Sequence, residues 1–316
     1  MTLSNTIERL TEMVSIDWDA TQTILNHDHQ HKLQLIQAIC NQRSKGKQLR
    51  SLLVLSIGHL FHACNETHHQ LAAIVEVIHY ATLLHDDVID QAVKRHNKPT
   101  AWTTHGNKAS ILVGDYMFSR AFRWISELKD PIIIQSLAQA TQLIVEGEVE
   151  QHQVKGLLSL DEETYFTIIH AKTAELFRQT CMLGAYAAHA SPTLQQHAEA
   201  FGLNIGIAFQ LQDDLLDYVS ADSGKSTGQD WSEGKVTYPL IVAYRKDPQT
   251  MKRFFKNKES FDDVLHFLKT VNAFKDTQEK INHYTDLALD ALNQLPDHDI
   301  KQPLLELTEW MRHREY

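Results

Sequence analysis

Residues 71–90 read LAAIVEVIHYATLLHDDVID and end in three aspartates, Asp86, Asp87 and Asp90. Apolar residues recur in this stretch at spacings of three and four, which predicts a helix with an acidic end. Carboxylates repel one another and are costly to bury, and the C-terminal end of a helix is already partly negative. The three aspartates are therefore expected to hold something positively charged.

The same D-D-x-x-D spacing recurs in FQLQDDLLDY (209–218), as Asp213, Asp214 and Asp217. One such motif is common on solvated helix ends, but each of these two leads into a loop with Lys or Arg. The matched pair favours one site with facing acidic walls, where Mg²⁺ would bind carboxylates and the phosphates of a substrate. The apolar residues before the first motif are expected to line a channel for a hydrocarbon tail.

The remainder of the chain also shows helical periodicity. Only 12 glycines and 7 prolines interrupt 316 residues, of which 43% are hydrophobic. We predict one all-α domain over residues 1–316, with helices near 2–25, 29–42, 47–63, 67–94, 107–126, 131–152, 161–189, 193–220, 235–246, 258–269, 271–294 and 299–313.

Composition excludes several classes of protein. The net charge of −10 and the lack of a basic block argue against a nucleic-acid binder. The three cysteines, Cys40, Cys64 and Cys181, form no CxxC pair, which fits a reducing, cytoplasmic setting. We expect neither a secretory signal nor a transmembrane helix. The histidines of NHDHQHK (26–32) and the adjacent pair His68-His69 are not interpreted as a zinc site.

Seven stretches of the chain form a recognisable series. In chain order they are GKQLR (46–50), IHYATLLHDDVID (78–90), LVGDYMFSRAF (112–122), EGEVEQ (146–151), KTAELF (172–177), FQLQDDLLDY (209–218) and GKSTGQDWSEGKVTYPL (224–240). Taken together, they resemble the all-trans polyprenyl diphosphate synthases, and most of all the bacterial long-chain members such as octaprenyl diphosphate synthase. The resemblance implies a single-domain, isoprenoid-synthase-type bundle of helices around a deep central cavity.

The resemblance also implies an Mg²⁺-dependent prenyltransferase with three Mg²⁺ ions per active site. Such an enzyme condenses an allylic primer, here farnesyl or geranylgeranyl diphosphate, head-to-tail with successive isopentenyl diphosphates and releases diphosphate. The product we favour is octaprenyl diphosphate, within a heptaprenyl-to-nonaprenyl range, for quinone side chains. A homodimer is implied, with transient membrane association for product release.

By resemblance, the metal ligands and the residues that support them can be assigned. Direct Mg²⁺ ligands are expected at Asp86, Asp90 and Asp213. Residues that act through water, or that orient these ligands, are expected at Asp87, Asp214 and Asp217.

The substrate-binding residues are also assigned by resemblance. Those for the allylic diphosphate are Arg95, Lys172, Lys225 and Lys235, and those that stabilise the developing cation are Thr173 and Gln210. Those for isopentenyl diphosphate are Lys47, Arg50 and His79, and a polar pair near the metals is formed by Glu148 and Gln151.

His96 departs from the family pattern, which has two consecutive arginines at this point. A neutral imidazole cannot make the two-pronged contact of a guanidinium, so we expect weak binding of isopentenyl diphosphate, more so as pH rises. His96→Arg is expected to lower KM for isopentenyl diphosphate in a steady-state assay. An unchanged KM would contradict this interpretation.

Product length is predicted from three residues before the first motif, Ile78, Ala81 and Thr82. By resemblance they can form the floor of the tail channel, and none is aromatic, which points to a long product. Thr82 and Ile78 lie nearer the aspartate face of the helix than Ala81 does.

Other functions remain open at this point. A shorter-chain synthase or the catalytic subunit of a two-component synthase would share these motifs. A terpene cyclase would carry an Asn/Ser/Glu triad as its second motif, which DDLLD (213–217) does not match. A non-catalytic prenyl-diphosphate-binding partner would tend to lose aspartates, and this chain keeps all six.

Overall fold

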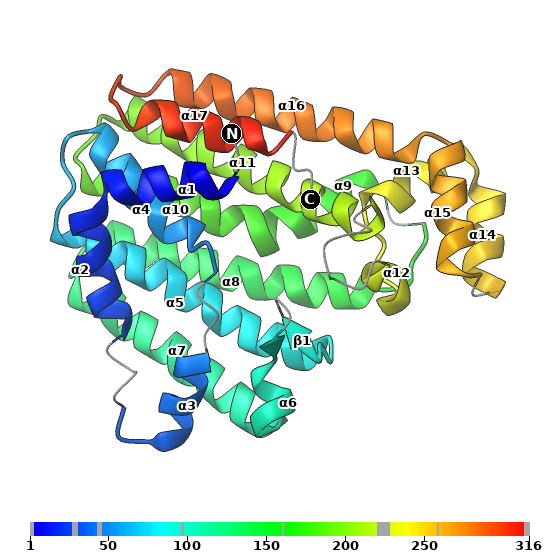
Figure 1. Cartoon of the computed structure of the whole chain (residues 1–316), viewed down its shortest axis with the longest axis horizontal. Coiled ribbons are helices and arrows are strands. Elements are labelled where there is room, and N and C mark those ends of the chain that lie inside the picture. The colour runs from blue at the N-terminus through cyan, green and yellow to red at the C-terminus, as the bar shows by residue number, and fades with distance from the viewer. Residues whose placement is uncertain are drawn as a thin grey trace. The chain divides into compact units, whose positions relative to one another are not determined.

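Nearly all the secondary structure of the chain is helical, as predicted (Figure 1). A computed structural model describes residues 3–26, 31–42, 46–95, 98–159, 161–219, 228–257 and 259–312. The chain comprises two compact units. Unit 1 comprises Met1–Thr141, Gln179–Glu199 and Leu292–Leu307, and unit 2 comprises Gln142–Arg178, Ala200–Ala291 and Thr308–Tyr316.

Unit 1 is built around α5, which packs against α2, α4 and α7. The side chain of Asn65 starts α5 by accepting hydrogen bonds from the backbone N–H groups of Thr67 and His68. The elements that lie wholly in this unit are α1 (Leu3–Met13), α2 (Ser15–Leu25), α3 (Gln34–Gln42), α4 (Leu49–Leu60), α5 (Glu66–Ile89), β1 (Lys94–Arg95), β2 (Lys98–Pro99), α6 (Ala101–His105) and α7 (Asn107–Glu127).

Unit 2 buries its own apolar core, in which Leu211, Tyr165 and Leu240 take part. Its elements are α9 (Glu162–Ile169), the π-helix η2 (His170–Ala174), α12 (Gln229–Glu233), α13 (Tyr238–Lys246), α14 (Pro248–Asn257) and α15 (Phe261–Thr270). Five further helices contribute residues to both units: α8 (Pro131–Val154), α10 (Glu175–Ala187), α11 (Pro192–Val219), α16 (Ala273–Asn293) and α17 (Lys301–Trp310).

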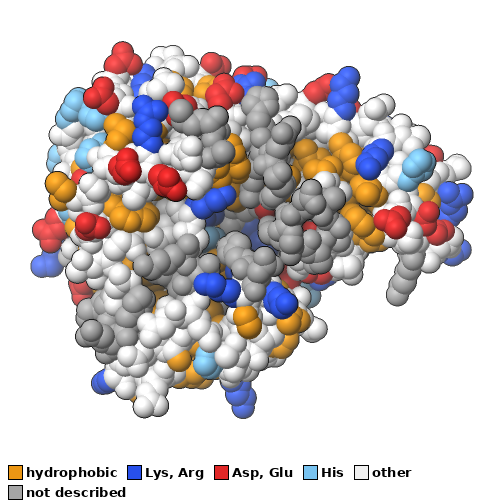
Figure 2. All heavy atoms as spheres, viewed as in Figure 1, with side chains coloured by type: hydrophobic (Ala, Val, Ile, Leu, Met, Phe, Trp, Pro, Cys, Tyr) orange, Lys and Arg blue, Asp and Glu red, His pale blue; other side chains and the backbone are white. Residues whose placement is uncertain are grey.

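The helices α14 and α15 are amphipathic, with an apolar buried face and a charged outer face. Met251 and Phe254 of α14 and Val264 and Leu268 of α15 are buried. Basic, acidic and histidine side chains are mixed on the outside of the two helices, at the right of Figure 2. Among the described residues, no helix combines the length and the apolar character needed to span a bilayer.

Some predicted boundaries differ from the observed ones. The helix expected over 67–94 ends at Ile89, because Gln91 turns into the left-handed region at φ 52°. The helix expected over 2–25 is interrupted at Val14, and the one over 161–189 contains the π-helix. The short helices α6, α12 and α14 were not predicted.

Glu162, at the start of α9, gives unit 2 a pH-dependent contribution to stability. Its carboxylate lies 2.8 Å from Lys280 Nζ, also pairs with Arg245, and accepts a hydrogen bond from the Tyr238 hydroxyl. Burial alone would raise the pKa of Glu162, but the hydrogen bond and charge of Lys280, with Arg245, lower it overall. The unfolded chain therefore binds the proton more readily, and the contribution is present above pH ~4.5 and lost as pH falls through the folded pKa.

Glu162→Gln is expected to lower Tm at pH 7 by about 1–3 °C, since partly exposed ion pairs contribute about 0.2–1 kcal/mol. The difference from the wild type should shrink progressively in melts run at lower pH, as the pH falls through the folded pKa. The exposed neighbour Glu163 supplies a control, Glu163→Gln. Equal and pH-independent changes in both variants would contradict the assignment.

Candidate functional site

The first acidic motif occupies the C-terminal end of α5, in unit 1. His79, Thr82, Asp86 and Asp90 are all partly exposed and lie at spacings of three and four, so they share one face of the helix. Asp87 is only 5% exposed. The structure therefore brings the two predicted direct ligands, Asp86 and Asp90, to the accessible face and turns the predicted supporting residue inward.

Asp87 holds Arg95, which sits on the first strand after the helix. Nε of Arg95 donates to Oδ1 of Asp87 at 2.9 Å, and a second guanidinium nitrogen lies 2.8 Å from the same oxygen. The antiparallel pair β1–β2 places Arg95 opposite Lys98. A guanidinium has five N–H donors, so this contact leaves capacity for a phosphate. His96 lies outside the described residues.

The residues predicted to bind isopentenyl diphosphate differ in exposure. Lys47, before α4, is exposed, and His79 is partly exposed. Arg50 is only 9% exposed and lies near Glu76. Burial lowers the pKa of Arg50 to about 10 against the raising effect of Glu76, so it stays charged at neutral pH. In unit 1, Lys47 and His79 are thus the more accessible of the three.

The second acidic motif, on α11, contributes to a pocket within unit 2 that encloses about 170 Å³. The pocket brings together most of the residues that the sequence assigned to this part of the chain. Its polar lining includes Asp213, Asp214, Lys172, Thr173, Gln210, Gln151 and Lys235, together with Tyr165, Asp230 and Lys155.

A continuous chain of hydrogen bonds fixes one wall of this pocket. The Thr173 hydroxyl donates to the side-chain oxygen of Gln210 at 2.7 Å, and the Gln210 amide donates to Asp214 Oδ1 at 2.7 Å. The Tyr165 hydroxyl donates to Asp214 Oδ2 at 2.6 Å. With both its oxygens engaged, Asp214 orients its neighbours, whereas Asp213 is partly exposed and lines the pocket.

Asp217, the third member of the motif, caps the short helix α12. Its two carboxylate oxygens accept the backbone N–H groups of Gln229 at 3.1 Å and of Asp230 at 3.0 Å. Lys235 lies 2.8 Å from Glu233. Asp217 therefore anchors the segment that delivers Lys235 to the pocket, while Lys225 lies outside the described residues.

The π-helix η2 presents Lys172 to the pocket. Its Nζ donates to Gln151 Oε1 at 2.5 Å and pairs with Glu148, so the predicted polar pair positions this cation. Gly147 allows this contact, because a Cβ there would lie 2.7 Å from Ala171 Cβ and 3.2 Å from the Lys172 backbone nitrogen. The EGEVEQ motif thus combines a close helix approach with two partners for one lysine.

The electrostatics of the pocket favour a bound cation. Burial raises the pKa of Asp214 to about 7 against its hydrogen bonds, and the charge of Asp213 adds to the rise. Burial, with the charges of Asp214 and Asp217, raises the pKa of Asp230 well above its usual value. A hard divalent cation, whose preferred ligands are oxygens, would reduce the repulsion between these neighbouring carboxylates.

Neither acidic motif encloses a cation by itself. Over the described ranges, no three of their carboxylates bring an oxygen each within 4.8 Å of one another. The donors present are carboxylate oxygens, the ligand type that Mg²⁺ takes alongside waters and substrate phosphates, so the donor chemistry fits Mg²⁺.

Four polar residues of the pocket, Lys155, Tyr165, Asp230 and Thr237, were not assigned from sequence. Tyr165 has no signature in the chain, because its role comes from a contact with Asp214 across 49 positions. Asp230 lies in the stretch GKSTGQDWSEGKVTYPL (224–240) that carries the family resemblance, but no role was assigned to it.

Comparison with known proteins adds independent information. The family described as "Polyprenyl synthetase" matches residues 32–271. The octaprenyl diphosphate synthase of Escherichia coli is 30% identical over 95% of this chain and 97% of its own length.

Solved structures agree with these matches. A decaprenyl diphosphate synthase from Rhodobacter capsulatus has a TM-score of 0.92 at 33% identity, over 98% of this chain and 99% of its own. A polyprenyl synthase from Caulobacter crescentus, complexed with calcium and isoprenyl diphosphate, has a TM-score of 0.89 at 33% identity, over 98% of each chain.

Proposed function

The chain belongs to the polyprenyl synthetase family, and on that basis we propose that it is a trans-prenyltransferase that makes a long-chain prenyl diphosphate. The resemblance predicted from its motifs is confirmed by the family match. The observation that carries the proposal is the pocket of unit 2, where Asp213 lies with Lys172 and Lys235. Carboxylates for a metal and cations for phosphate oxygens are what transfer from a diphosphate requires.

Mg²⁺ is the proposed cofactor, with Asp86, Asp90 and Asp213 as its direct ligands and three ions in each active site. The solved relative complexed with calcium and isoprenyl diphosphate supports binding of both a divalent metal and a diphosphate. Bound Mg²⁺ would stabilise the negative charge that develops on the departing diphosphate. In unit 2, Asp214 and Asp217 would then act by positioning, since each of their carboxylate oxygens already accepts a hydrogen bond.

The chain's own residues supply the remaining functions of the proposal. Lys172, Lys225, Lys235 and Arg95 bind the allylic diphosphate. Its C1–O bond breaks and releases diphosphate, and C1 is attacked by the double bond of isopentenyl diphosphate. The released diphosphate takes up the proton that the lengthened chain loses. The Thr173 hydroxyl and the Gln210 side chain, joined at 2.7 Å, face the developing cation as fixed dipoles. Lys47, Arg50, His79 and His96 bind isopentenyl diphosphate.

The names of the relatives support a long-chain product, and the finer assignments are our proposals. The named relatives make octaprenyl and decaprenyl diphosphates. We propose farnesyl or geranylgeranyl diphosphate as primer, an octaprenyl product for a quinone side chain, a homodimer and a cytoplasmic location. Geranylgeranyl-length products are the alternative, and a two-component synthase is a second one, since component 2 of a heptaprenyl diphosphate synthase is 32% identical over 86% of the chain.

One assay tests the proposal and separates its rivals. The purified chain is incubated with Mg²⁺, labelled isopentenyl diphosphate and farnesyl diphosphate, and the products are sized by mass spectrometry after dephosphorylation. A ladder that ends near octaprenyl is expected. A cyclised hydrocarbon, or bound substrate without any condensation, would overturn the proposal.

A further inference from the structure

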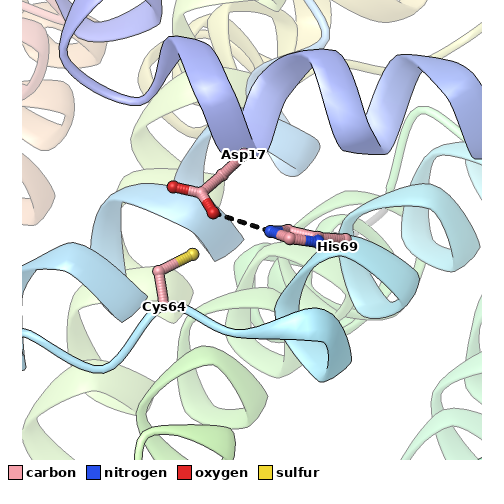
Figure 3. Close-up of side chains that lie close together, drawn as sticks. All are labelled: Asp17, Cys64 and His69. Atoms are coloured by element: carbon pink, nitrogen blue, oxygen red, sulfur yellow. Dashed lines mark hydrogen bonds and ion pairs between the residues drawn. The ribbon is translucent and has the colours of Figure 1, made fainter.

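A group of potential metal ligands lies in unit 1 at the opposite end of α5 from the first acidic motif. Asp17 comes from the first turn of α2, Cys64 from the segment after α4, and His69 from the first turns of α5. Figure 3 shows the Asp17 carboxylate directed towards the His69 ring, with the Cys64 sulfur beside it. One ligand atom from each residue lies within 4.8 Å of the other two.

A fourth side chain completes the arrangement. Asp17 Oδ1 lies 2.7 Å from His69 Nε2, and Asp17 Oδ2 lies 2.7 Å from Nε2 of His59, at the end of α4. Asp17 and His69 are each about one-fifth exposed. The cluster is therefore partly buried yet open to small solutes.

The adjacent histidines of the pair His68-His69 have separate roles. The His68 ring is fully buried, and its Nε2 contacts the Gly184 carbonyl oxygen at 2.9 Å. Gly58 leaves room for it, because a Cβ there would lie 2.6 Å from the ring. His68 is thus occupied in packing and helix capping, whereas His69 points into the cluster.

We propose that Asp17, Cys64 and His69 form a zinc site, with water as the fourth ligand. His59 would orient Asp17 through Oδ2 of the Asp17 carboxylate. One imidazole, one thiolate and one carboxylate are ligands that Zn²⁺ takes in tetrahedral sites. Zinc–ligand bonds of about 2.0–2.3 Å require ligand atoms about 3.3–3.8 Å apart. The 2.7 Å contact between Asp17 Oδ1 and His69 Nε2 would therefore open by about 0.6 Å, and the Cys64 sulfur, within 4.8 Å of both, would move in by at most about 1 Å. A metal ligand is commonly held in its orientation by a hydrogen bond to a second residue, as His59 would hold the Asp17 carboxylate.

The donor set separates this site from the acidic motifs. Mg²⁺ avoids thiolate and imidazole ligands, so the two classes of site select different metals. The rival interpretation is a hydrogen-bond network without metal, in which the Cys64 thiol donates to Asp17. Burial, with the charge and hydrogen bond of Asp17, raises the pKa of Cys64 to about 12, so the metal must displace the thiol proton to solvent.

Cobalt titration of the full chain tests the proposal. Excess Mg²⁺ occupies the oxygen-only sites, and a thiol-free phosphine reductant keeps Cys64 reduced. We expect one equivalent of Co²⁺ to give a thiolate-to-cobalt band in the near ultraviolet together with tetrahedral visible bands, and Zn²⁺ to abolish both by displacement. Zn²⁺ should also raise Tm in proportion to the logarithm of its concentration.

Matched variants identify the ligands. Cys64→Ala should lose the thiolate band, whereas Cys40→Ala should keep it. His69→Ala should weaken binding at least about 100-fold and His59→Ala about 10–100-fold, with His197→Ala unchanged. Circular dichroism confirms that each variant is folded. No band in the wild type, or an undiminished band in folded Cys64→Ala, overturns the zinc site and leaves the hydrogen-bond network. These readouts do not involve prenyl transfer, so failure here is distinct from failure of the proposed function.

Discussion

Asp213→Ala is expected to lower kcat about a thousandfold while leaving the helical content of the chain unchanged. Polarisation of a leaving group by a metal contributes several kcal/mol, and each ~1.4 kcal/mol corresponds to about tenfold in rate. Asp213 is the member of the second motif that is partly exposed in the pocket, so its loss should remove a direct ligand. The measurement is steady-state prenyl transfer over a range of Mg²⁺ concentrations.

Two further variants make the comparison specific. Asp214→Asn should lose only about 10–100-fold, since Asp214 acts through its contacts with Tyr165 and Gln210 rather than on the metal. Asp262→Ala, on the exposed face of α15 in the same unit, should have no effect. If Asp213→Ala kept more than a tenth of wild-type activity at saturating Mg²⁺, the assignment of a direct ligand would be wrong.

The two acidic motifs show which features of the site can be predicted from the sequence and which cannot. Their spacing correctly predicted helical carboxylates, and the all-α class followed from periodicity. The second aspartate nevertheless has different surroundings in the two motifs. Asp87 pairs with Arg95, eight residues away, whereas Asp214 accepts a hydrogen bond from Tyr165, 49 residues away. Spacing alone cannot distinguish a partner in the next strand from one brought in by tertiary packing.

The π-helix is the clearest feature that periodicity missed. Residues 161–189 carry a continuous helical pattern, and one wide turn at His170–Ala174 hardly alters apolar spacing. That turn nevertheless carries Lys172 and Thr173, two of the residues assigned to the site. By contrast, α14 was missed although its sequence carries a helical signal: Pro248 begins it, and Met251 and Phe254 follow at spacings of three.

Thr82→Phe is expected to shorten the main product by several isoprene units. Thr82 is partly exposed on the face of α5 that carries Asp86 and Asp90, and it lies one turn before Asp86. A ring at this position would occupy the path of a tail whose diphosphate is held at the aspartates. The side chain of Thr82 donates only to the His79 carbonyl oxygen of its own helix, at 2.8 Å, so its replacement should cost little stability.

Ala81→Phe is expected to shorten the product as well, at a cost in stability that Thr82→Phe avoids. Ala81 has no exposed surface and Ile78 is 1% exposed, so a ring at 81 must be inserted among packed side chains. Overpacking of this kind costs about 1–3 kcal/mol, which should appear as a Tm several degrees lower. Thr67→Phe, at the other end of α5, is the matched control for added bulk. The products of each variant are sized by mass spectrometry, and Tm is measured for each. An unchanged product from Thr82→Phe would show that the accessible face of α5 does not line the channel.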